Sequence, residues 1–350
     1  MPCYAEASMQ ERSANRSLTV AAQNRRGGRA EPIPSRDRKG AVYRASIRSL
    51  AKINLDLRVL HKQPSGFHEM RTVFHTISLA DSIEVEYEAA RRTEISLEDD
   101  AGIPDNLILR AAHAALDAMK VSARVCFRLI KRIPMGGGLG GGSSNAAAVL
   151  MTLPALAGRG LTRETAMELA AELGSDVPFF VLGGAAVGAG RGAELYPLPD
   201  LAPEPLLMIA SGVHVSTPGA YGALNRGAEF SDAPRVIRSF QEYVWALERD
   251  RSAAAVSALS ANDFETSVFA RHPRLGAIAA RLKKLGLVRV RMTGSGSVIF
   301  ALFRSSEELR RAEGALRGQP ALEGCRIMRA SLVSRRKYRQ MWQRQLGSGR

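Results

Sequence analysis

The chain has 350 residues, a length that exceeds one small core and fits two domains of ordinary size. Hydrophobic residues make up 45% and charged residues 24%, as in soluble globular proteins, and no run approaches the roughly 18 apolar residues of a membrane span, so a membrane-spanning protein is disfavoured. The formal net charge of +15 is unevenly placed, with +6 in residues 1–48, +8 in residues 326–350 and +1 between them.

The N-terminal segment lacks apolar periodicity and is rich in Arg, Ser, Gly and Pro, which predicts a disordered basic extension over residues 1–41. Such segments also occur as organellar transit peptides, so a plastid protein is an alternative. Four acidic residues count against it: Glu6, Glu11, Glu31 and Asp37. The three cysteines are far apart and have no histidines at metal-ligand spacing. This pattern favours a reducing compartment and hence the cytoplasm.

Apolar and polar residues alternate from Val42 onward, which predicts strands. The first segment, residues 42–60, is two strand lengths long, and a loop marked by Pro64, Ser65 and Gly66 follows it. Further strands are expected at residues 71–79, 81–89, 93–98 and 123–134, and an apolar stripe predicts a helix at residues 106–120.

The last of these strands runs into PMGGGLGGGSSN, residues 134–145, and a helix should follow with Ser143 or Ser144 as its N-cap. A second helix should begin after Thr162 and end at Gly174. Residues 175–195 are interpreted as buried strand material with bends at glycines. The Pro-rich segment PLPDLAPEP then marks a domain boundary at residue 200.

Beyond this boundary, strands are predicted at residues 205–211, 288–292, 297–303 and 325–333. Helices are predicted at STPGAY, in two stretches between Val236 and Gly286, and at residues 305–318. Sheet and helix mix without regular alternation, which favours an α+β fold in both halves. The domains are assigned to residues 42–200 and 201–335, with a basic tail at residues 336–350.

The glycine-rich segment has the features of a phosphate cradle: a strand, then six glycines in seven positions, then a helix start. A Walker A loop needs lysine where Gly142 stands, which excludes that class. Gly136, Gly138 and Gly141 match the dinucleotide fingerprint, but the acid expected about 20 positions on would be Glu164, inside a predicted helix. A turn needed only for close packing is a poor explanation of six glycines, because each glycine loses more conformational entropy on folding than any other residue. Charge neutralisation is therefore expected from the helix end and a metal rather than from a lysine.

The segment PMGGGLGGGSSNAA resembles the second signature of the GHMP kinases, which bind ATP through a glycine-rich loop ahead of a helix. SLAKINLDLRVL with GFHEM, LGSDVPFF and MTGSGSVIFALF resemble further motifs of the branch that acts on 4-diphosphocytidyl-2-C-methyl-D-erythritol. The resemblance covers residues 48–335. Ser65 and Phe67 stand where that branch usually has Asp and Tyr, which puts the polar contacts of those two side chains in doubt.

The resemblance implies an ATP-dependent kinase that phosphorylates the 2-hydroxyl of this substrate, on the non-mevalonate route to isopentenyl diphosphate. It also implies a left-handed βαβ crossover in the N-terminal domain, a ferredoxin-like α/β sandwich in the C-terminal domain, and ligands in the cleft between them. Magnesium would bind through the ATP phosphates, with Ser143 or Ser144 as a further ligand. The expected ATP-binding residues are Pro134, Met135, Gly136, Gly137, Gly138, Leu139, Gly140, Gly141, Gly142, Ser143 and Ser144.

The same resemblance implies roles for single residues. Asp176 would be the base that takes the proton of the substrate hydroxyl, and Lys52 would be its partner. Asn54 should lie on the same face of the strand as Lys52, because side chains alternate. His68 would hydrogen-bond the cytosine, with aromatic rings stacked on both faces of the base. The expected substrate-binding residues are Asn54, Phe67, His68, Tyr221, Gly294 and Ser295, of which Gly294 and Ser295 would face the glycine loop.

Two alternatives stay open. Another GHMP kinase, acting on homoserine, mevalonate or a sugar, would have no use for a nucleobase clamp at Phe67 and His68. An RNA-binding protein is suggested by the basic ends and opposed by the nearly neutral body. Deletion of residues 1–40 and 336–350 should leave a kinase active and abolish RNA binding. We therefore expect a small-molecule substrate, no membrane or nucleic-acid partner, and a monomer or homodimer.

Overall fold

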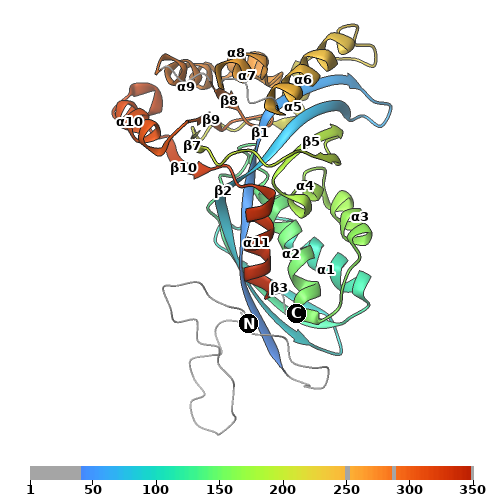
Figure 1. The fold of residues 1–350 in the computed structure, drawn as a ribbon. Helices are drawn as coiled ribbons and strands as arrows, with labels where there is room; N and C mark the ends of the chain where they lie inside the picture. Colours follow the sequence, from blue (N-terminus) through green and yellow to red (C-terminus); the bar gives the residue numbers. More distant parts are fainter. Residues whose placement is uncertain (1–40, 249–252, 286–288, 348–350) are drawn as a thin grey trace.

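The computed structural model describes residues 41–248, 253–285 and 289–347, which fold around two separate sheets (Figure 1). The extension predicted for residues 1–41 lies outside the described residues apart from Ala41. The first sheet contains β1 (Val42–Lys62), β2 (His68–Ala89), β3 (Glu94–Asp99), β4 (Ala123–Ile130), β5 (Ala185–Gly190) and β6 (Glu194–Pro197). Its order is β3-β4-β2-β5-β6, and β1 pairs with β2.

β1 and β2 are longer than predicted. Residues 42–60 were expected to span two strand lengths and residues 71–79 and 81–89 to form two strands, but each segment is one strand, of 21 and 22 residues, in a single antiparallel pair. Neither segment contains a glycine or proline that would interrupt it. The pair carries Leu57, Val59 and Met70 into the hydrophobic core of the second domain. This hairpin is therefore shared by both halves of the molecule.

Helices α1 (Leu107–Met119), α2 (Gly141–Ala157) and α3 (Arg163–Leu173) pack on the first sheet and share its core (Figure 1). The predicted limits of α3 are confirmed: the Thr162 side chain accepts a hydrogen bond from the Thr165 N–H at 3.1 Å, and Gly174 ends the helix. β3 and β4 are parallel and flank α1, so a βαβ crossover is present, and its left hand stays a prediction.

Residues 175–195 were expected to be strand material, which is wrong for the first part. Val177–Leu182 form a short helix, α4, and only β5 and β6 beyond it are strands. Pro178 in the first helical turn favours a helix start. Phe179 and Phe180 are fully buried, and a short apolar run that is buried all round has no periodicity to separate helix from strand.

The second sheet contains β7 (Pro205–Ala210), β8 (Val290–Met292), β9 (Ile299–Leu302) and β10 (Arg326–Ser331) in the antiparallel order β10-β7-β9-β8. A helical crossover joins β7 to β8, and α10 (Ser306–Leu316) with a 3-10 turn (Pro320–Leu322) joins β9 to β10. This is the predicted ferredoxin-like arrangement. The chain passes between the two sheets within residues 197–205, where the Pro-rich segment lies.

The crossover between β7 and β8 contains more helices than predicted. Within the described residues it consists of α5 (Thr217–Ala223), α6 (Ala233–Glu248), α7 (Ala253–Leu259), α8 (Phe264–Arg271) and α9 (Pro273–Lys284), where two helices were expected after Val236. Pro273 separates α8 from α9, because the residue before a proline is pushed out of the helical region. Asn262 accepts from the Phe264 N–H at 3.0 Å and starts α8.

The assignment of residues 336–350 to a basic tail is wrong. Residues Arg335–Leu346 form helix α11, which returns to the first domain and packs in its core (Figure 1). Tyr338 and Trp342 are 1% and 8% exposed, and their spacing of four residues places them on one helix face. The basic charge of this segment concealed that apolar face, and deletion of residues 336–350 would remove part of the core.

Trp342→Ala should lower the free energy of unfolding by about 3 kcal/mol, because it removes a buried aromatic side chain from the core. Denaturant unfolding of the full chain measures this change. Lys337→Ala, an exposed position on the same helix, should stay within about 0.5 kcal/mol of the parent. Equal stability of the Trp342→Ala variant and the parent would contradict the docking of α11.

Candidate active site

The glycine loop joins β4 to α2 and has the conformation that its glycines allow. Gly136, Gly138 and Gly140 have φ values of 65°, 76° and 69°, which residues other than glycine rarely adopt. α2 begins at Gly141, and its N-cap is Gly140. The prediction that Ser143 or Ser144 caps this helix is therefore wrong. The first-turn N–H groups of α2 have no carbonyl partner within the helix and can bind anions.

The turn at Gly294 lies directly against this loop, as the resemblance implied. The Thr293 hydroxyl donates to the Gly138 carbonyl at 3.1 Å, and the Val298 N–H donates to the Gly137 carbonyl at 3.3 Å. A Cβ atom at Gly138 would lie 2.1 Å from the Thr293 carbonyl oxygen. Backbone therefore contacts backbone here, and the second domain supports the glycine loop of the first.

Lys52 and Asp176 lie together beside the loop. The Lys52 Nζ atom is 3.3 Å from Asp176 Oδ2, with the lysine side chain 4% exposed and the carboxylate 33% exposed. Asp176 occupies the N-cap position of α4, but its side chain makes no capping hydrogen bond. Lys52 also lies over the Phe74 ring, 5.1 Å from its centroid, and its backbone N–H donates to the Leu139 carbonyl at 3.0 Å. The structure therefore pairs the two residues that the sequence analysis paired.

Asn54 shares the strand face of Lys52 and is buried. Its Oδ1 atom accepts from Lys52 Nζ and from the Gly294 N–H, both at 2.9 Å. Its Nδ2 atom donates to the Thr72 hydroxyl at 2.8 Å. Asn54 was expected to bind substrate, but its amide is engaged with protein groups and connects Lys52 to the Gly294 turn.

The predicted cytosine-binding residues are only partly brought together. His68 and Tyr221 stack on each other with centroids 4.9 Å apart, and Tyr221 packs edge-on against Phe264 at 4.8 Å. Phe67 is 52% exposed and lies under the Arg191 guanidinium group, 5.8 Å from the ring centroid. Phe67 and Tyr221 therefore do not form an open clamp, and His68 covers one face of the Tyr221 ring.

Burial lowers the pKa of His68 below its ordinary value, and the neighbouring charges of Lys62 and Arg226 act in the same direction. A hydrogen bond to the backbone of Arg226 acts against them. The imidazole is thus mainly neutral at pH 7, when one ring nitrogen can donate a hydrogen bond and the other can accept one.

The remaining predicted residues differ in what they offer a ligand. The Ser144 hydroxyl donates to the Leu50 carbonyl at 2.6 Å and is buried, whereas Ser143 is partly exposed. The Leu139 side chain is buried in the core, and Met135 is 63% exposed. The Ser295 hydroxyl is hydrogen-bonded to the Thr217 hydroxyl at 2.9 Å, which connects the Gly294 turn to α5.

Three residues near the loop were missed by the sequence analysis. Lys131 forms an ion pair with Asp81, and its Nζ atom would lie 2.9 Å from a Cβ at Gly141. A lysine therefore stands beside the first turn of α2, contrary to the expectation of a site without one. His214 lies against Gly136, 3.5 Å from the position of a Cβ, and Thr293 holds Gly138. Of these three residues, only Thr293 could have been found from the sequence, because it adjoins the predicted site residue Gly294.

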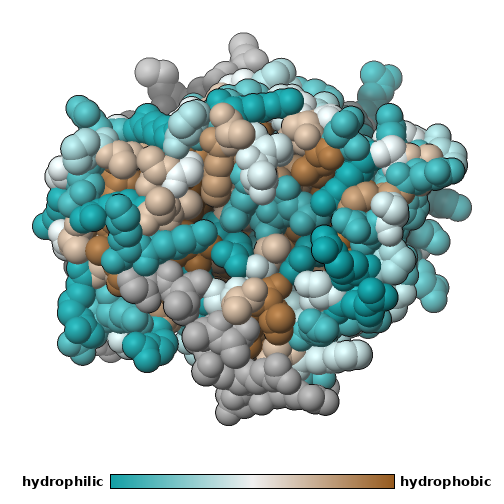
Figure 2. Space-filling model, turned by 90° about the horizontal axis from the view of Figure 1, so that it is seen from above, coloured by the Kyte–Doolittle hydropathy of each residue, from teal (hydrophilic) through white to brown (hydrophobic). Residues whose placement is uncertain are grey.

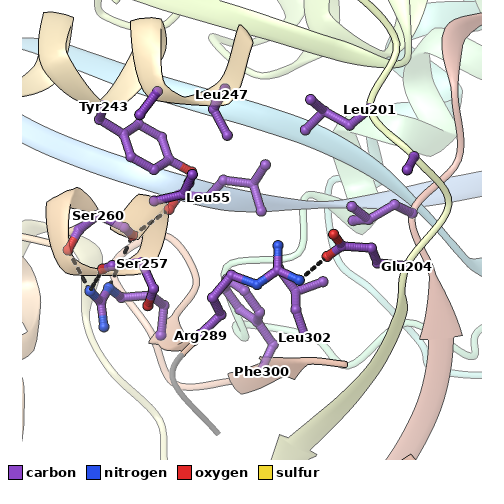
Figure 3. A pocket seen from close by; sticks show the side chains of 15 residues that line it. Leu55, Leu201, Glu204, Tyr243, Leu247, Ser257, Ser260, Arg289, Phe300 and Leu302 are labelled. Carbon is purple, nitrogen blue, oxygen red and sulfur yellow. Dashed lines mark hydrogen bonds and ion pairs between the residues drawn. The ribbon is translucent and has the colours of Figure 1, made fainter. Parts of the chain in front are cut away.

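A cavity of about 430 Å³ lies elsewhere, between α6 and the second sheet (Figure 3). Its lining mixes apolar side chains with Tyr243, Ser257, Ser260 and Arg291, and an ion pair joins Arg289 to Glu204 in its wall. It contains none of the predicted site residues. Seen from above, hydrophobic side chains reach the surface only in scattered groups (Figure 2). Among the described residues no helix is long and apolar enough to cross a bilayer, and no cluster of three acidic, His or Cys side chains could hold a metal.

Comparison with known proteins identifies the relatives of the chain. Residues 106–184 match the family model "GHMP kinases N terminal domain", and residues 243–321 match "GHMP kinases C terminal". A protein of Solibacter usitatus named 4-diphosphocytidyl-2-C-methyl-D-erythritol kinase is 49% identical over 304 residues, 86% of this chain and 92% of that one. A crystal structure of 4-(cytidine 5'-diphospho)-2C-methyl-D-erythritol kinase is 34% identical, with a TM-score of 0.67 and coverage of 83% and 99% of the two chains.

Homoserine kinase from Cytophaga hutchinsonii is a further structural neighbour, with a TM-score of 0.68 over 86% of this chain and 97% of the other. At 17% identity this similarity shows the shared fold alone.

Gly138→Ala should lower the free energy of unfolding by more than about 2 kcal/mol, because the new methyl group meets the Thr293 carbonyl and the residue keeps a positive φ. Gly142→Ala is the matched control, since the nearest atom to its Cβ would be Leu107 Cδ1 at 3.8 Å. It should change stability by less than about 1 kcal/mol. Thermal unfolding without nucleotide measures both. Equal midpoints for the two variants would contradict the contact between loop and turn.

Proposed function

The chain belongs to the family of 4-diphosphocytidyl-2-C-methyl-D-erythritol kinases, a branch of the GHMP kinases, and from this premise we propose how its site performs the reaction. The protein is an ATP-dependent small-molecule kinase. We assign the transfer of the ATP γ-phosphoryl group to the 2-hydroxyl of the substrate to the pair of Lys52 and Asp176. The observation that carries this assignment is their 3.3 Å contact beside the glycine loop.

Phosphoryl transfer requires the protein mainly to position a nucleophile and to neutralise charge on the oxygens. Asp176 is one-third exposed, so a hydroxyl group can reach its carboxylate. In our proposal Asp176 accepts the hydroxyl proton as the oxygen attacks the γ-phosphorus, the bond from this phosphorus to the bridging oxygen of the β-phosphate breaks, and ADP leaves. Lys52 orients the carboxylate through their ion pair. The Asn54 amide oxygen positions Lys52, because it accepts a hydrogen bond from Lys52 Nζ and another from the Gly294 N–H.

The nucleotide phosphates bind at the glycine loop in this proposal. The first-turn N–H groups of α2 point at the ligand, and the positive end of the helix favours its charge. Lys131 contributes a cation beside Gly141 in place of the absent Walker lysine. Asp81 fixes this lysine, because its carboxylate also accepts from the N–H groups of Arg132 and Ile133 at 2.7 and 2.8 Å.

Magnesium fits this site only as an ion shared with ATP. The described residues offer no cluster of three acidic, His or Cys ligands, so the phosphates would supply most of its oxygens. Of the two predicted serines, Ser143 is the partly exposed one and would be the ligand, whereas the Ser144 hydroxyl is committed to the Leu50 carbonyl. Bound magnesium would neutralise charge on the β- and γ-phosphates.

Recognition of the cytidine half is assigned to His68, Tyr221 and Phe67. The neutral imidazole of His68 can both donate and accept a hydrogen bond, as the edge of a cytosine requires. Tyr221 provides a ring that is held edge-on by Phe264, and Phe67 provides a second ring at the exposed side. Because His68 stacks on Tyr221, the imidazole must move from that ring when the base binds.

The rival functions are less well supported. A kinase for homoserine, mevalonate or a sugar would share the fold but has no use for the aromatic and histidine group around Tyr221. An RNA-binding protein would not need the buried Lys52 and its carboxylate partner. The bacterial sources of the relatives support a cytoplasmic setting over a plastid one.

Asp176→Asn should lower kcat by about 10²- to 10⁴-fold, because the amide cannot accept the hydroxyl proton. The KM values should change little, since the side chain keeps its size. ADP release with ATP, magnesium and the cytidine diphosphate substrate measures both constants. A folded parent protein that shows no turnover would sink the assigned function, and an Asn variant with parental kcat would remove Asp176 from the reaction.

His68→Ala should raise the KM for the cytidine substrate far more than the KM for ATP. For the parent, the KM for the cytidine substrate should rise as the pH falls, and this rise should begin at a lower pH than an ordinary histidine would give, because burial lowers the His68 pKa and protonation removes its acceptor. The variant should lose this rise. Equal effects on both KM values would remove His68 from the cytosine site.

A further inference from the structure

We propose that helix α11 is a positioning element for phosphoryl transfer, acting through Tyr338 and Arg335 on the helix that presents Asp176. This inference rests on the proposed role of Asp176. The sequence motifs that resemble the kinase family lie within residues 48–335. Helix α11 begins at Arg335 and therefore follows these motifs in the chain. In Figure 1 α11 lies against the helices of the first domain, and its residues join the core cluster that contains Phe179 and Phe180.

Helix α4 cannot be stable by itself, since it has six residues and an isolated helix of that length does not form. Its position must come from its neighbours. At its C-terminal end the Gly183 N–H donates to the Phe179 carbonyl at 2.7 Å. The next carbonyl, that of Phe180, accepts from the Tyr338 hydroxyl at 2.5 Å. Tyr338 thus satisfies a carbonyl that the short helix leaves without an internal partner.

Arg335 holds the backbone that follows α4. Its guanidinium group donates to the Gly183 carbonyl at 3.1 Å, to the Leu198 carbonyl at 3.0 Å and to the Ala185 carbonyl. The planar fork of arginine suits three acceptors in fixed directions, which a lysine could not reach together. The Asp200 carboxylate accepts from the backbone N–H groups of Arg335 and Arg336, which fixes the start of α11.

The glycines after α4 are required by this docking. A Cβ atom at Gly183 would lie 2.1 Å from the Tyr338 ring, and one at Gly184 would lie 2.5 Å from the Arg335 Cβ. Both residues also have positive φ values, 66° and 75°. The sequence analysis had read these glycines only as bends. They instead give α11 its close approach to α4.

Helix α4 also contacts the glycine loop, through the side chain of Phe180. A Cβ atom at Gly140 would lie 2.8 Å from Phe180 Cζ and 3.2 Å from Lys52 Cγ, so the Phe180 ring and the Lys52 side chain both pack against the loop at Gly140. Phe180 therefore carries the Tyr338 hydrogen bond on its carbonyl and the loop contact on its ring. A shift of α4 would move Asp176 from Lys52, and a misplacement of about 1 Å can cost about 100-fold in rate.

Tyr338→Phe tests the proposal with little loss of packing, because it removes only the hydroxyl. We expect kcat to fall about 3- to 30-fold, with both KM values within about twofold of the parent. Met341→Ala is the matched control. Met341 lies on the same helix and packs on the same core, but no described hydrogen bond joins it to α4 through its side chain. It should lower the unfolding midpoint and leave kcat unchanged.

Arg335→Lys tests the second contact, and its effect on kcat should have the same direction as that of Tyr338→Phe. Hydrogen exchange of a peptide covering residues 176–184 should be faster in both variants and parental in Met341→Ala, a readout that needs no substrate. Turnover by the parent decides the proposed function separately from this comparison. Parental kcat and parental exchange in Tyr338→Phe and Arg335→Lys, or an equal loss of kcat in Met341→Ala, would overturn the positioning role.

Discussion

A buried lysine is the constraint on which the rest of the site depends. The Lys52 side chain is 4% exposed, and an ammonium group removed from water is costly unless it is paired and hydrogen-bonded. Three groups meet this need: the Asp176 carboxylate, the Asn54 amide oxygen and the face of the Phe74 ring. They come from α4, β1 and β2, so the three elements must stay in register for the charge to be tolerated.

The second domain enters this arrangement through backbone contacts rather than through a charged side chain. Asn54 accepts from the Gly294 N–H, and Thr293 donates to the Gly138 carbonyl. Side chains on Gly138 or Gly294 would separate the two segments, since a Cβ at Gly294 would lie 3.0 Å from Gly138 Cα. The glycine loop, the lysine and the hairpin between β8 and β9 therefore form one connected unit, although they are more than 80 residues apart along the chain in each case.

Charge neutralisation at the loop shows why a motif alone was an incomplete guide. The absence of a lysine at Gly142 correctly excluded a Walker A loop. It did not exclude a lysine from elsewhere, and Lys131 reaches Gly141 from the end of β4, with Asp81 of β2 as its partner. The same holds for the cytosine site, where Phe67, His68 and Tyr221 were all named from the resemblance. The stacking of His68 on Tyr221, with Phe67 apart from them, depends on how the loop at residues 63–67 meets α5, which no residue spacing specifies.

The sequence by itself determined the features that depend on neighbours along the chain. These include the glycine loop before a helix, the shared strand face of Lys52 and Asn54, and the limits of α3, because alternation, capping and backbone freedom are local properties. The resemblance added the pairing of Lys52 with Asp176 and the approach of the Gly294 turn. Only the tertiary structure decided that Val177–Leu182 is a helix and that Ser144 turns to Leu50. It also decided that α11 docks on Gly183 and Gly184. These outcomes depend on which distant surfaces meet. Burial against another segment overrides the structure that a short apolar run or a basic segment favours by itself.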